Sequence, residues 1–175
     1  FNDARARRAL LYLVDQPNYL KAMWGDADIW KPCRAFLACG SVLGSEAGAE
    51  PDFGKSKDKA KALMTEAGYK GEPIVLMQPT DIAFLANATL LLAQDLRSIG
   101  MTVDVQAMDF STLAKRRTIT KPAKEGGWHI ALTWWNGTSS SDPVGNLPVG
   151  AACEKSWPGW PCDAPHQALI DAFYA

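Results

Sequence analysis

The side chains best suited to chemistry gather in one short stretch, WWNGTSSSDP, at residues 134–143. Three consecutive serines precede Asp142 there, and His129 and His166 complete the residue types of a serine-hydrolase triad. The chain has no other histidine, however, and it lacks the G-x-S-x-G turn that exposes such a nucleophile. We therefore predict no catalytic residue, and a secreted serine hydrolase domain stays an alternative.

The same stretch suits ligand binding better, because two large aromatic side chains stand where a strand is predicted to end. The apolar run HIALTWW predicts a strand over residues 129–135. Adjacent side chains of a strand point to opposite faces, so Trp134, which shares the face of Ile130 and Leu132, is predicted to face the core. Trp135 lies on the other face, where we predict that it contacts a ligand.

Polar groups and a permissive backbone follow directly after these rings, at Asn136, Gly137 and Thr138. In open α/β sheets, ligands bind beyond the carboxyl ends of the strands. We therefore predict a ligand-binding site made by Trp135 and these three residues, with Trp134 beside them. An ordinary solvated turn explains the same residue types, and in that case the chain would be a non-catalytic interaction module.

Four cysteines fall into two local pairs, Cys33 with Cys39 and Cys153 with Cys162. Pairing within each would staple one irregular loop and would imply an oxidising compartment. Four cysteines allow three connectivities, and four unpaired thiols in a reducing compartment remain the alternative. No metal site is expected, because neither pair has the short ligand spacing of structural zinc sites.

The composition is that of a globular protein, with 175 residues, of which 47% are apolar and 21% charged. The net charge is -1 with both signs dispersed, so no nucleic-acid partner is expected. The basic cluster Lys115, Arg116 and Arg117 lacks interleaved aromatic residues and is predicted to be a solvated helix face. No apolar run is long enough to span a bilayer.

The elements that must position these residues alternate between helix and strand. Capping residues and helical spacing predict helices that begin at Asn2 or Asp3, Asp15, Ser56, Asp81, Asp109 or Ser111, and Pro165. Short apolar or alternating runs predict strands over residues 74–78, 101–107 and 129–135. Segments near residues 29–54 and 150–164 have no sustained period and predict loops that disulfides would staple. The predicted fold class is α/β, with a mostly parallel sheet and helices on both faces.

Several segments together resemble one family, the solute-binding proteins of the dipeptide, oligopeptide and nickel class (solute-binding protein family 5), which serve ABC importers. The segments that carry the resemblance are FNDARARRALLYLVDQPNYLKAMWG, KSKDKAKALMTEAGYKG, LLLAQDLRSIGMTVDVQAMD and GGWHIALTWWNGTSSSDP. Their order and spacing match the family over nearly the full 175 residues.

The resemblance implies that residues 1–175 are a single C-terminal ligand-binding lobe, of the periplasmic-binding-protein-like type II, in a fragment of a two-lobed receptor. Such a receptor would be periplasmic or lipid-anchored outside the cytoplasm, which agrees with the predicted disulfides. It would capture a peptide-like or other small polar solute between its lobes and deliver it to the permease subunits of an ABC transporter. The resemblance implies no cofactor and a monomer, and we expect negligible ligand binding by the isolated lobe.

One departure from the family pattern concerns the ligand. In peptide-binding relatives, an aspartate shortly after the strand-end tryptophan pairs with the free amino group of the ligand. The corresponding positions here carry Asn136, Gly137 and Thr138, and Asp142 belongs to a later Asp-Pro turn. A buried ammonium group without a carboxylate partner is strongly unfavourable. We therefore expect a neutral, anionic or differently held ligand instead of a dipeptide with a free amino terminus.

Overall fold

Residues 1–175 are described by a computed structural model, in which the chain forms two compact units. Each unit is assembled from two separate stretches of the chain. The first, here called the sheet unit, comprises Phe1–Pro32 and Glu50–Thr133. The second, here called the loop unit, comprises Cys33–Ala49 and Trp134–Ala175.

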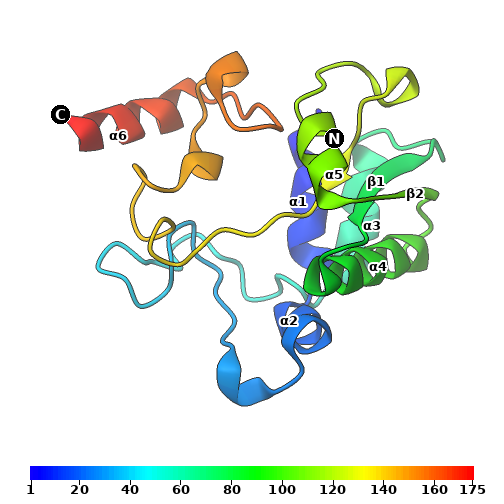
Figure 1. Cartoon of the computed structure of the whole chain (residues 1–175), viewed down its shortest axis with the longest axis horizontal. Coiled ribbons are helices and arrows are strands. Elements are labelled where there is room, and N and C mark those ends of the chain that lie inside the picture. Colours follow the sequence, from blue (N-terminus) through cyan, green and yellow to red (C-terminus); the bar gives the residue numbers. More distant parts are fainter. The chain divides into compact units, whose positions relative to one another are not determined.

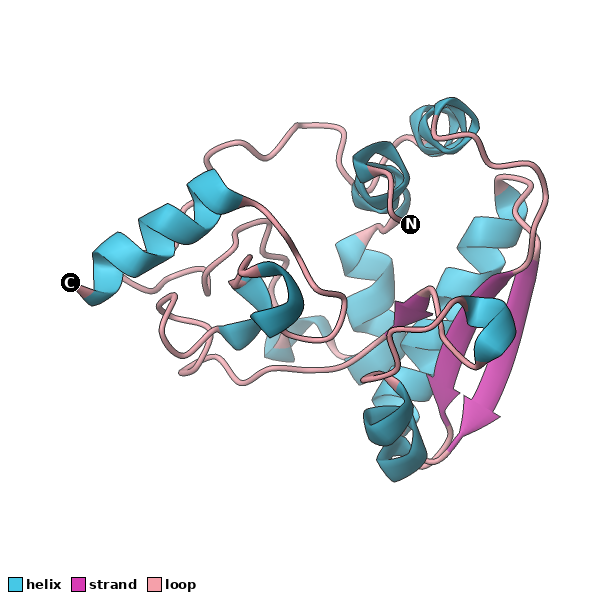
Figure 2. Ribbon diagram, turned by 90° about the horizontal axis from the view of Figure 1, so that it is seen from above, coloured by secondary structure: helices cyan, strands magenta, loops and turns pink.

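Three parallel strands in the order β2-β1-β3 form the centre of the sheet unit. Strand β1 (Ile74–Pro79) pairs along its whole length with β2 (Val103–Met108), and only two of its residues pair with β3 (Ile130–Ala131). The two long strands are the broad magenta arrows in Figure 2. A parallel order requires a crossover between β1 and β2, and the intervening helix α4 (Ala83–Ser98) provides it.

Helices cover both faces of this sheet, as the sequence predicts. The helices of the unit are α1 (Ala4–Leu13), α2 (Gln16–Trp24), α3 (Lys57–Glu66), α4 and α5 (Phe110–Arg116), and all of them are labelled in Figure 1. On one face, Leu76 of β1 and Leu96 of α4 are fully buried in a core shared with α1 and α3. The alternate residues Val75 and Met77 are buried on the other face, and α5 packs against β1 with Leu113 fully buried.

Most of the predicted helix starts are confirmed, because short polar side chains accept hydrogen bonds from first-turn amides. Asp3 accepts from Arg5 N at 2.7 Å, and Asp109 accepts from Thr112 N at 2.9 Å. Ser56 occupies the same position before α3. The predicted α/β class with a parallel sheet is confirmed by these elements together.

Two predicted elements are wrong in detail. Asp81 does not cap α4, whose N-cap is Ile82, and its Oδ1 accepts instead from the backbone N–H of Phe110 at 2.8 Å. The third strand is two residues long and does not extend over residues 129–135. It pairs only with Leu76 and Met77, and after Thr133 the chain leaves the sheet unit altogether.

Little regular structure occurs in the loop unit. It contains the helix α6 (Ala164–Tyr174) and the short 3-10 turns η3 (Leu147–Val149) and η4 (Cys153–Lys155). Both predicted disulfides, Cys33–Cys39 and Cys153–Cys162, lie in this unit, and no cysteine is free. Each disulfide lies within one of the two segments predicted to be loops, 29–54 and 150–164.

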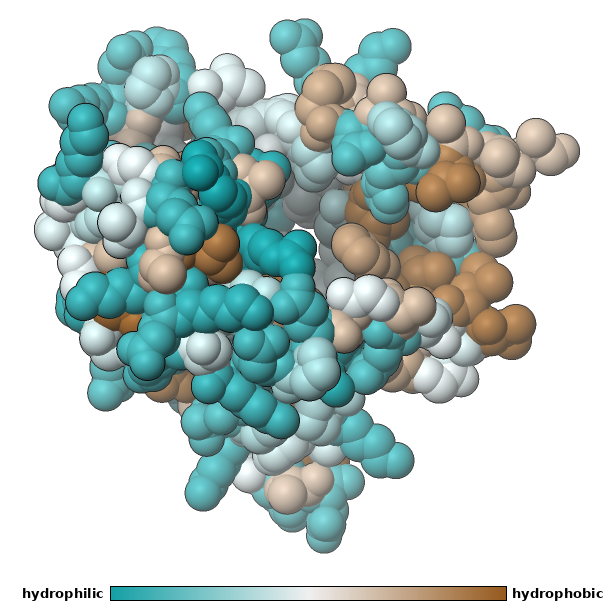
Figure 3. Space-filling view, turned by 180° about the vertical axis from the view of Figure 1, so that it is seen from behind, coloured by the Kyte–Doolittle hydropathy of each residue, from teal (hydrophilic) through white to brown (hydrophobic).

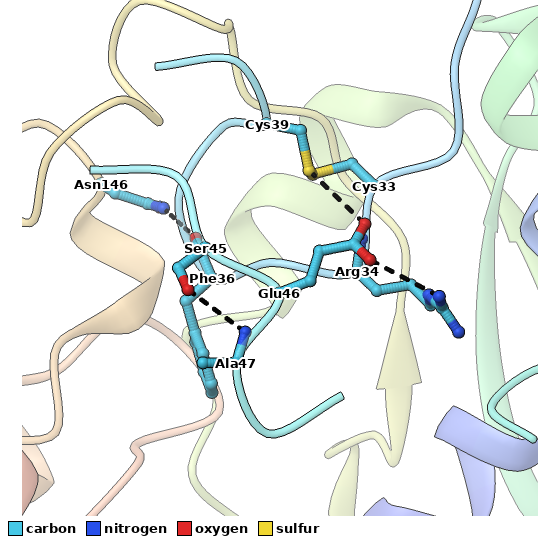
Figure 4. Close-up of a disulfide and its surroundings, with 8 residues drawn as sticks. All are labelled: Cys33, Arg34, Phe36, Cys39, Ser45, Glu46, Ala47 and Asn146. Carbon is cyan, nitrogen blue, oxygen red and sulfur yellow. Dashed lines mark hydrogen bonds and ion pairs between the residues drawn. A yellow bond between two sulfur atoms is a disulfide. The ribbon is translucent and has the colours of Figure 1, made fainter. Parts of the chain in front are cut away.

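Hydrogen bonds join the two stretches of the loop unit. Asn146, which is buried, donates from Nδ2 to the carbonyl oxygen of Phe36 at 3.0 Å, as Figure 4 shows next to the first disulfide. Ala38 N donates to Ser140 O at 2.8 Å. Glu46 accepts from the backbone N–H of Arg34 at 3.2 Å and so ties down the far side of the same loop. No helix of the chain is both long and apolar enough to cross a membrane.

Candidate functional site

The tryptophan pair does not have the orientation predicted from a strand. Trp134 was expected to face the core, but 48% of its surface is exposed. Trp135 is the more buried of the two, and its Nε1 donates to the carbonyl oxygen of Gly145 at 3.1 Å. The alternation argument fails because β3 ends at Ala131, so that neither ring belongs to a strand.

Residues 136–141 fold back on themselves through local hydrogen bonds. Asn136 Oδ1 accepts from Ser139 N at 2.8 Å, and Asn136 O accepts from the Ser140 hydroxyl at 2.9 Å. The Ser141 hydroxyl donates to Gly137 O at 2.7 Å. The Nδ2 amide of Asn136 and the hydroxyl of Thr138 lie on exposed residues and have no partner in the chain. These two groups are therefore available to a ligand.

Asp142 shapes the next turn, as its position before proline predicts. Its Oδ1 accepts from Val144 N and Gly145 N, both at 2.8 Å. The backbone packs so closely here that a Cβ added to Gly145 would lie 2.8 Å from Ser139 O. Glycine is therefore required at this position, and Asp142 holds the loop in shape.

Neither histidine supports the hydrolase alternative. His129 Nδ1 accepts from Val75 N at 2.9 Å, and burial lowers the pKa of this imidazole. A ring nitrogen of His166 is 2.8 Å from Val149 O. Both side chains are thus bound to backbone groups, as are the hydroxyls of Ser140 and Ser141.

Trp157 is the residue of this region that sequence reasoning missed. Its ring lies edge-to-face against that of Trp135, with centroids 5.0 Å apart and planes at 81°. The available signal was the motif WPGWP between Cys153 and Cys162, which concentrates aromatic and proline residues inside one disulfide loop. From the sequence, that segment predicts only a stapled loop.

Two members of the basic cluster Lys115, Arg116 and Arg117 make hydrogen bonds to a neighbouring loop, which the sequence does not predict. Arg116 donates from Nε to Gly126 O and from Nη2 to Gly127 O, both at 3.0 Å. Arg117 O accepts from the indole N–H of Trp128 at 3.1 Å. The Arg116 side chain and the Arg117 backbone therefore fasten the loop before β3, whereas Lys115 is exposed.

An open pocket of about 820 Å³ lies within the sheet unit, between α2, α4 and the loop that precedes α3. Its polar lining is centred on Asp95, which accepts from the Tyr19 hydroxyl at 2.9 Å and pairs with Lys57 at 3.2 Å. Burial and the nearby Asp95 carboxylate raise the pKa of Tyr19 above its usual value. The pocket contains no cluster of metal-ligating side chains, and neither does the rest of the chain.

Comparisons with known proteins agree with the fold. Residues 1–156 match the model of a family described as bacterial extracellular solute-binding proteins, family 5, middle. The chain is 35% identical over 170 residues to a curated Sinorhizobium fredii protein named "probable peptide ABC transporter periplasmic-binding protein y4tO", covering 97% of this chain and 32% of that protein.

Solved structures show the same fold. The crystal structure of the ABC transporter substrate-binding protein CtaP of Listeria monocytogenes matches with a TM-score of 0.80 at 21% identity, over 98% of this chain and 34% of that one. A dipeptide-binding protein of a Pseudoalteromonas species, in complex with Met-Leu, matches with a TM-score of 0.71 at 22% identity, over 98% and 33%. The chain thus spans about a third of the length of these relatives.

Proposed function

The chain belongs to family 5 of the bacterial extracellular solute-binding proteins, and we propose that residues 1–175 form one ligand-binding lobe of a receptor for an ABC importer. The observation that carries this proposal is the match of the family model to residues 1–156, which include the whole sheet and the loop 134–150. The full receptor would capture a peptide-like or other small polar solute and deliver it to permease subunits. The family is extracytoplasmic and not enzymatic.

Capture follows from differential affinity. A ligand that touches two lobes stabilises the closed arrangement over the open one, because only the closed arrangement makes both sets of contacts. One lobe alone offers only part of those contacts. We therefore infer that the isolated chain binds solutes negligibly. We also propose that the longer receptor is a monomer, either free in the periplasm or held by a lipid anchor.

The ligand contacts that we propose are Trp135, Asn136, Gly137 and Thr138, with Trp134 beside them. The free Nδ2 amide of Asn136 and the free hydroxyl of Thr138 support this choice, because both can donate to a solute carbonyl or carboxylate. No carboxylate stands at these positions, and the Oδ1 of Asp142 is committed to two backbone amides. A solute whose amino end is blocked or absent fits this set of groups best.

A matched pair of probes tests this proposal. Isothermal titration of the full-length receptor should show that acetylation of Ala-Phe costs no more than about threefold in affinity, because no ammonium partner is lost. Asn136→Ala should weaken binding of the acetylated probe by about fivefold, since one hydrogen bond contributes about 1 kcal/mol.

Two outcomes would contradict the proposal. If the receptor binds neither these probes nor a wider panel of small polar solutes, solute capture is wrong. If acetylation abolishes binding, the free amino end is recognised after all and the assignment of the contact residues fails. Asn87→Ala serves as the control, because Asn87 lies on α4 in the sheet unit and donates only to Ala22 O.

A further inference from the structure

The loop closed by the second disulfide carries two tryptophans, Trp157 and Trp160, which are not among the proposed ligand contacts. Residues 153–162 read CEKSWPGWPC, and the disulfide joins the two ends. An antiparallel bridge between Ala152 and Cys162 closes the base of this loop. Within it, Trp160 N donates to Trp157 O at 2.9 Å, and the Ser156 hydroxyl donates to Pro161 O at 3.0 Å. The loop is therefore a small closed ring and not a flexible connection.

The backbone of this ring is held in an uncommon conformation. Cys153 and Trp160 have positive φ values of 58° and 47°, and they are the only non-glycine residues of the chain that do. A bulky residue in that region costs free energy and persists only where its surroundings impose it. Such residues concentrate in ligand clamps and active sites. The conformation restricts the backbone of the ring on both sides of Trp157.

Trp157 points at the proposed ligand-binding loop. Its ring meets Trp135 at 81° with centroids 5.0 Å apart, and both side chains are only partly buried. The indole N–H of Trp135 is already bound to Gly145 O. What Trp135 can offer to a solute is therefore the apolar surface of its ring and no hydrogen bond.

The disulfide ring itself offers no net charge to attract a cation. It carries Glu154 and Lys155 side by side, and these charges cancel. The Oδ1 of Asp142 is held in its turn by two backbone amides. Two perpendicular, partly exposed indoles form a surface that suits a flat or branched apolar group, since aromatic pairs gain from offset and edge contacts.

We propose that Trp157, held by the Cys153–Cys162 ring, contacts the solute together with Trp135 and makes the receptor select solutes with an aromatic or branched apolar side chain. This inference rests on the proposed function and names the part of the solute that the other contacts leave open. Asn136 and Thr138 address the polar backbone of the solute, and the two indoles address its side chain.

Selectivity between two probes tests the inference. In the full-length receptor, N-acetyl-Ala-Phe should bind at least about tenfold more tightly than N-acetyl-Ala-Ser, as measured by isothermal titration. Trp157→Ala should remove most of this difference by weakening the Phe probe about tenfold while changing the Ser probe by less than about twofold. Trp157→Phe should keep most of the preference, because it keeps an aromatic face.

A matched control is Trp24→Ala. Trp24 is also a partly exposed tryptophan stacked on another ring, that of Phe84, but it lies on α2 in the sheet unit. This variant should leave the affinity of both probes unchanged. Thermal unfolding and thiol titration of each variant will show that the fold and both disulfides are intact.

The outcomes separate this inference from the function beneath it. If wild-type receptor binds no solute of the panel, the proposed function fails and the inference fails with it. If the receptor binds solutes but prefers the Ser probe, or if Trp157→Ala weakens both probes equally, Trp157 supports the loop only and the inference alone is overturned.

Discussion

The sheet unit and the loop unit are stabilised by different means. The sheet unit buries a continuous apolar core, in which Leu76, Ala93 and Leu96 have no exposed surface. The loop unit buries only Ala151 and Ile170 among its apolar side chains, and it holds both disulfides. Hydrophobic burial is the main stabilising contribution to the first unit, whereas covalent links constrain the second.

The difference follows from how each unit uses its apolar residues. Many large apolar side chains of the loop unit stay at its surface: Phe36, Val42, Trp134, Leu147, Leu169 and Phe173 are all exposed. Brown patches of such side chains mark the surface of the part that carries α6 in Figure 3. Apolar side chains that stay exposed contribute little burial free energy to their unit, and the cross-links compensate.

Shortening a buried side chain of the central strand β1 should give the largest loss of stability. Leu76→Ala removes a fully buried side chain from the core and should lower the free energy of unfolding of the sheet unit by about 2–5 kcal/mol. Urea denaturation, monitored by hydrogen exchange of the backbone amides in β1, measures the change. Leu90→Ala on α4, half-exposed, is the matched control and should shift stability by less than about 0.5 kcal/mol. Equal losses from both variants would refute the distinction between core and surface.

Removal of the second disulfide should act on the other unit. The pair Cys153→Ser and Cys162→Ser should destabilise the loop unit by about 2–3 kcal/mol, because a short closed loop no longer restricts the unfolded chain. Hydrogen exchange should speed up in residues 147–174 and stay unchanged in β1. A comparable loss of protection in β1 would mean that the sheet unit depends on the cross-link as well.

Loss of the buried Asn146 side chain should destabilise the loop unit less than loss of the disulfide. Asn146→Ala leaves Phe36 O without its donor and should cost about 1–3 kcal/mol within this unit. Limited proteolysis of residues 33–49 should become faster, since this bond holds them to the rest of the unit. Val42→Ala is the control, because the Val42 side chain is fully exposed in the same stretch. Proteolysis unchanged by Asn146→Ala would show that Ala38 N and the disulfide are sufficient.

Acidification should produce the smallest effect, and it should act on the sheet unit. Burial lowers the pKa of His129 below the value of 6.5 expected in the unfolded chain, so the unfolded state takes up a proton first. Stability should therefore be complete above that value and fall as the pH drops below it toward the folded pKa. Protonation of Nδ1 would also remove the acceptor for Val75 N.

His129→Asn isolates this contribution, because the amide oxygen can replace Nδ1 as acceptor but does not titrate. Thermal unfolding of both proteins at about pH 8 and about pH 5 measures it. The variant should lose less stability than the wild type over this interval. Identical pH profiles would assign the acid sensitivity to other groups.

Most of the sheet unit could be predicted from the sequence. Helical spacing and caps such as Asp3 and Asp109 are local signals, and the structure confirms them. The loop unit could be predicted only as irregular and disulfide-linked. The orientation predicted for Trp134 and Trp135 is wrong. The length of a strand depends on its partner, and β1 pairs with only two residues of β3. The contact between Trp135 and Trp157 is tertiary and left no periodic signal.

Each cysteine pairs with its nearest neighbour in the sequence, at separations of 6 and 9 residues. During export the residues emerge in order, so Cys39 meets Cys33 long before Cys153 appears. Short loops also close faster than long ones. Among the three pairings open to these four cysteines, the order of emergence and the short loops therefore favour the native one.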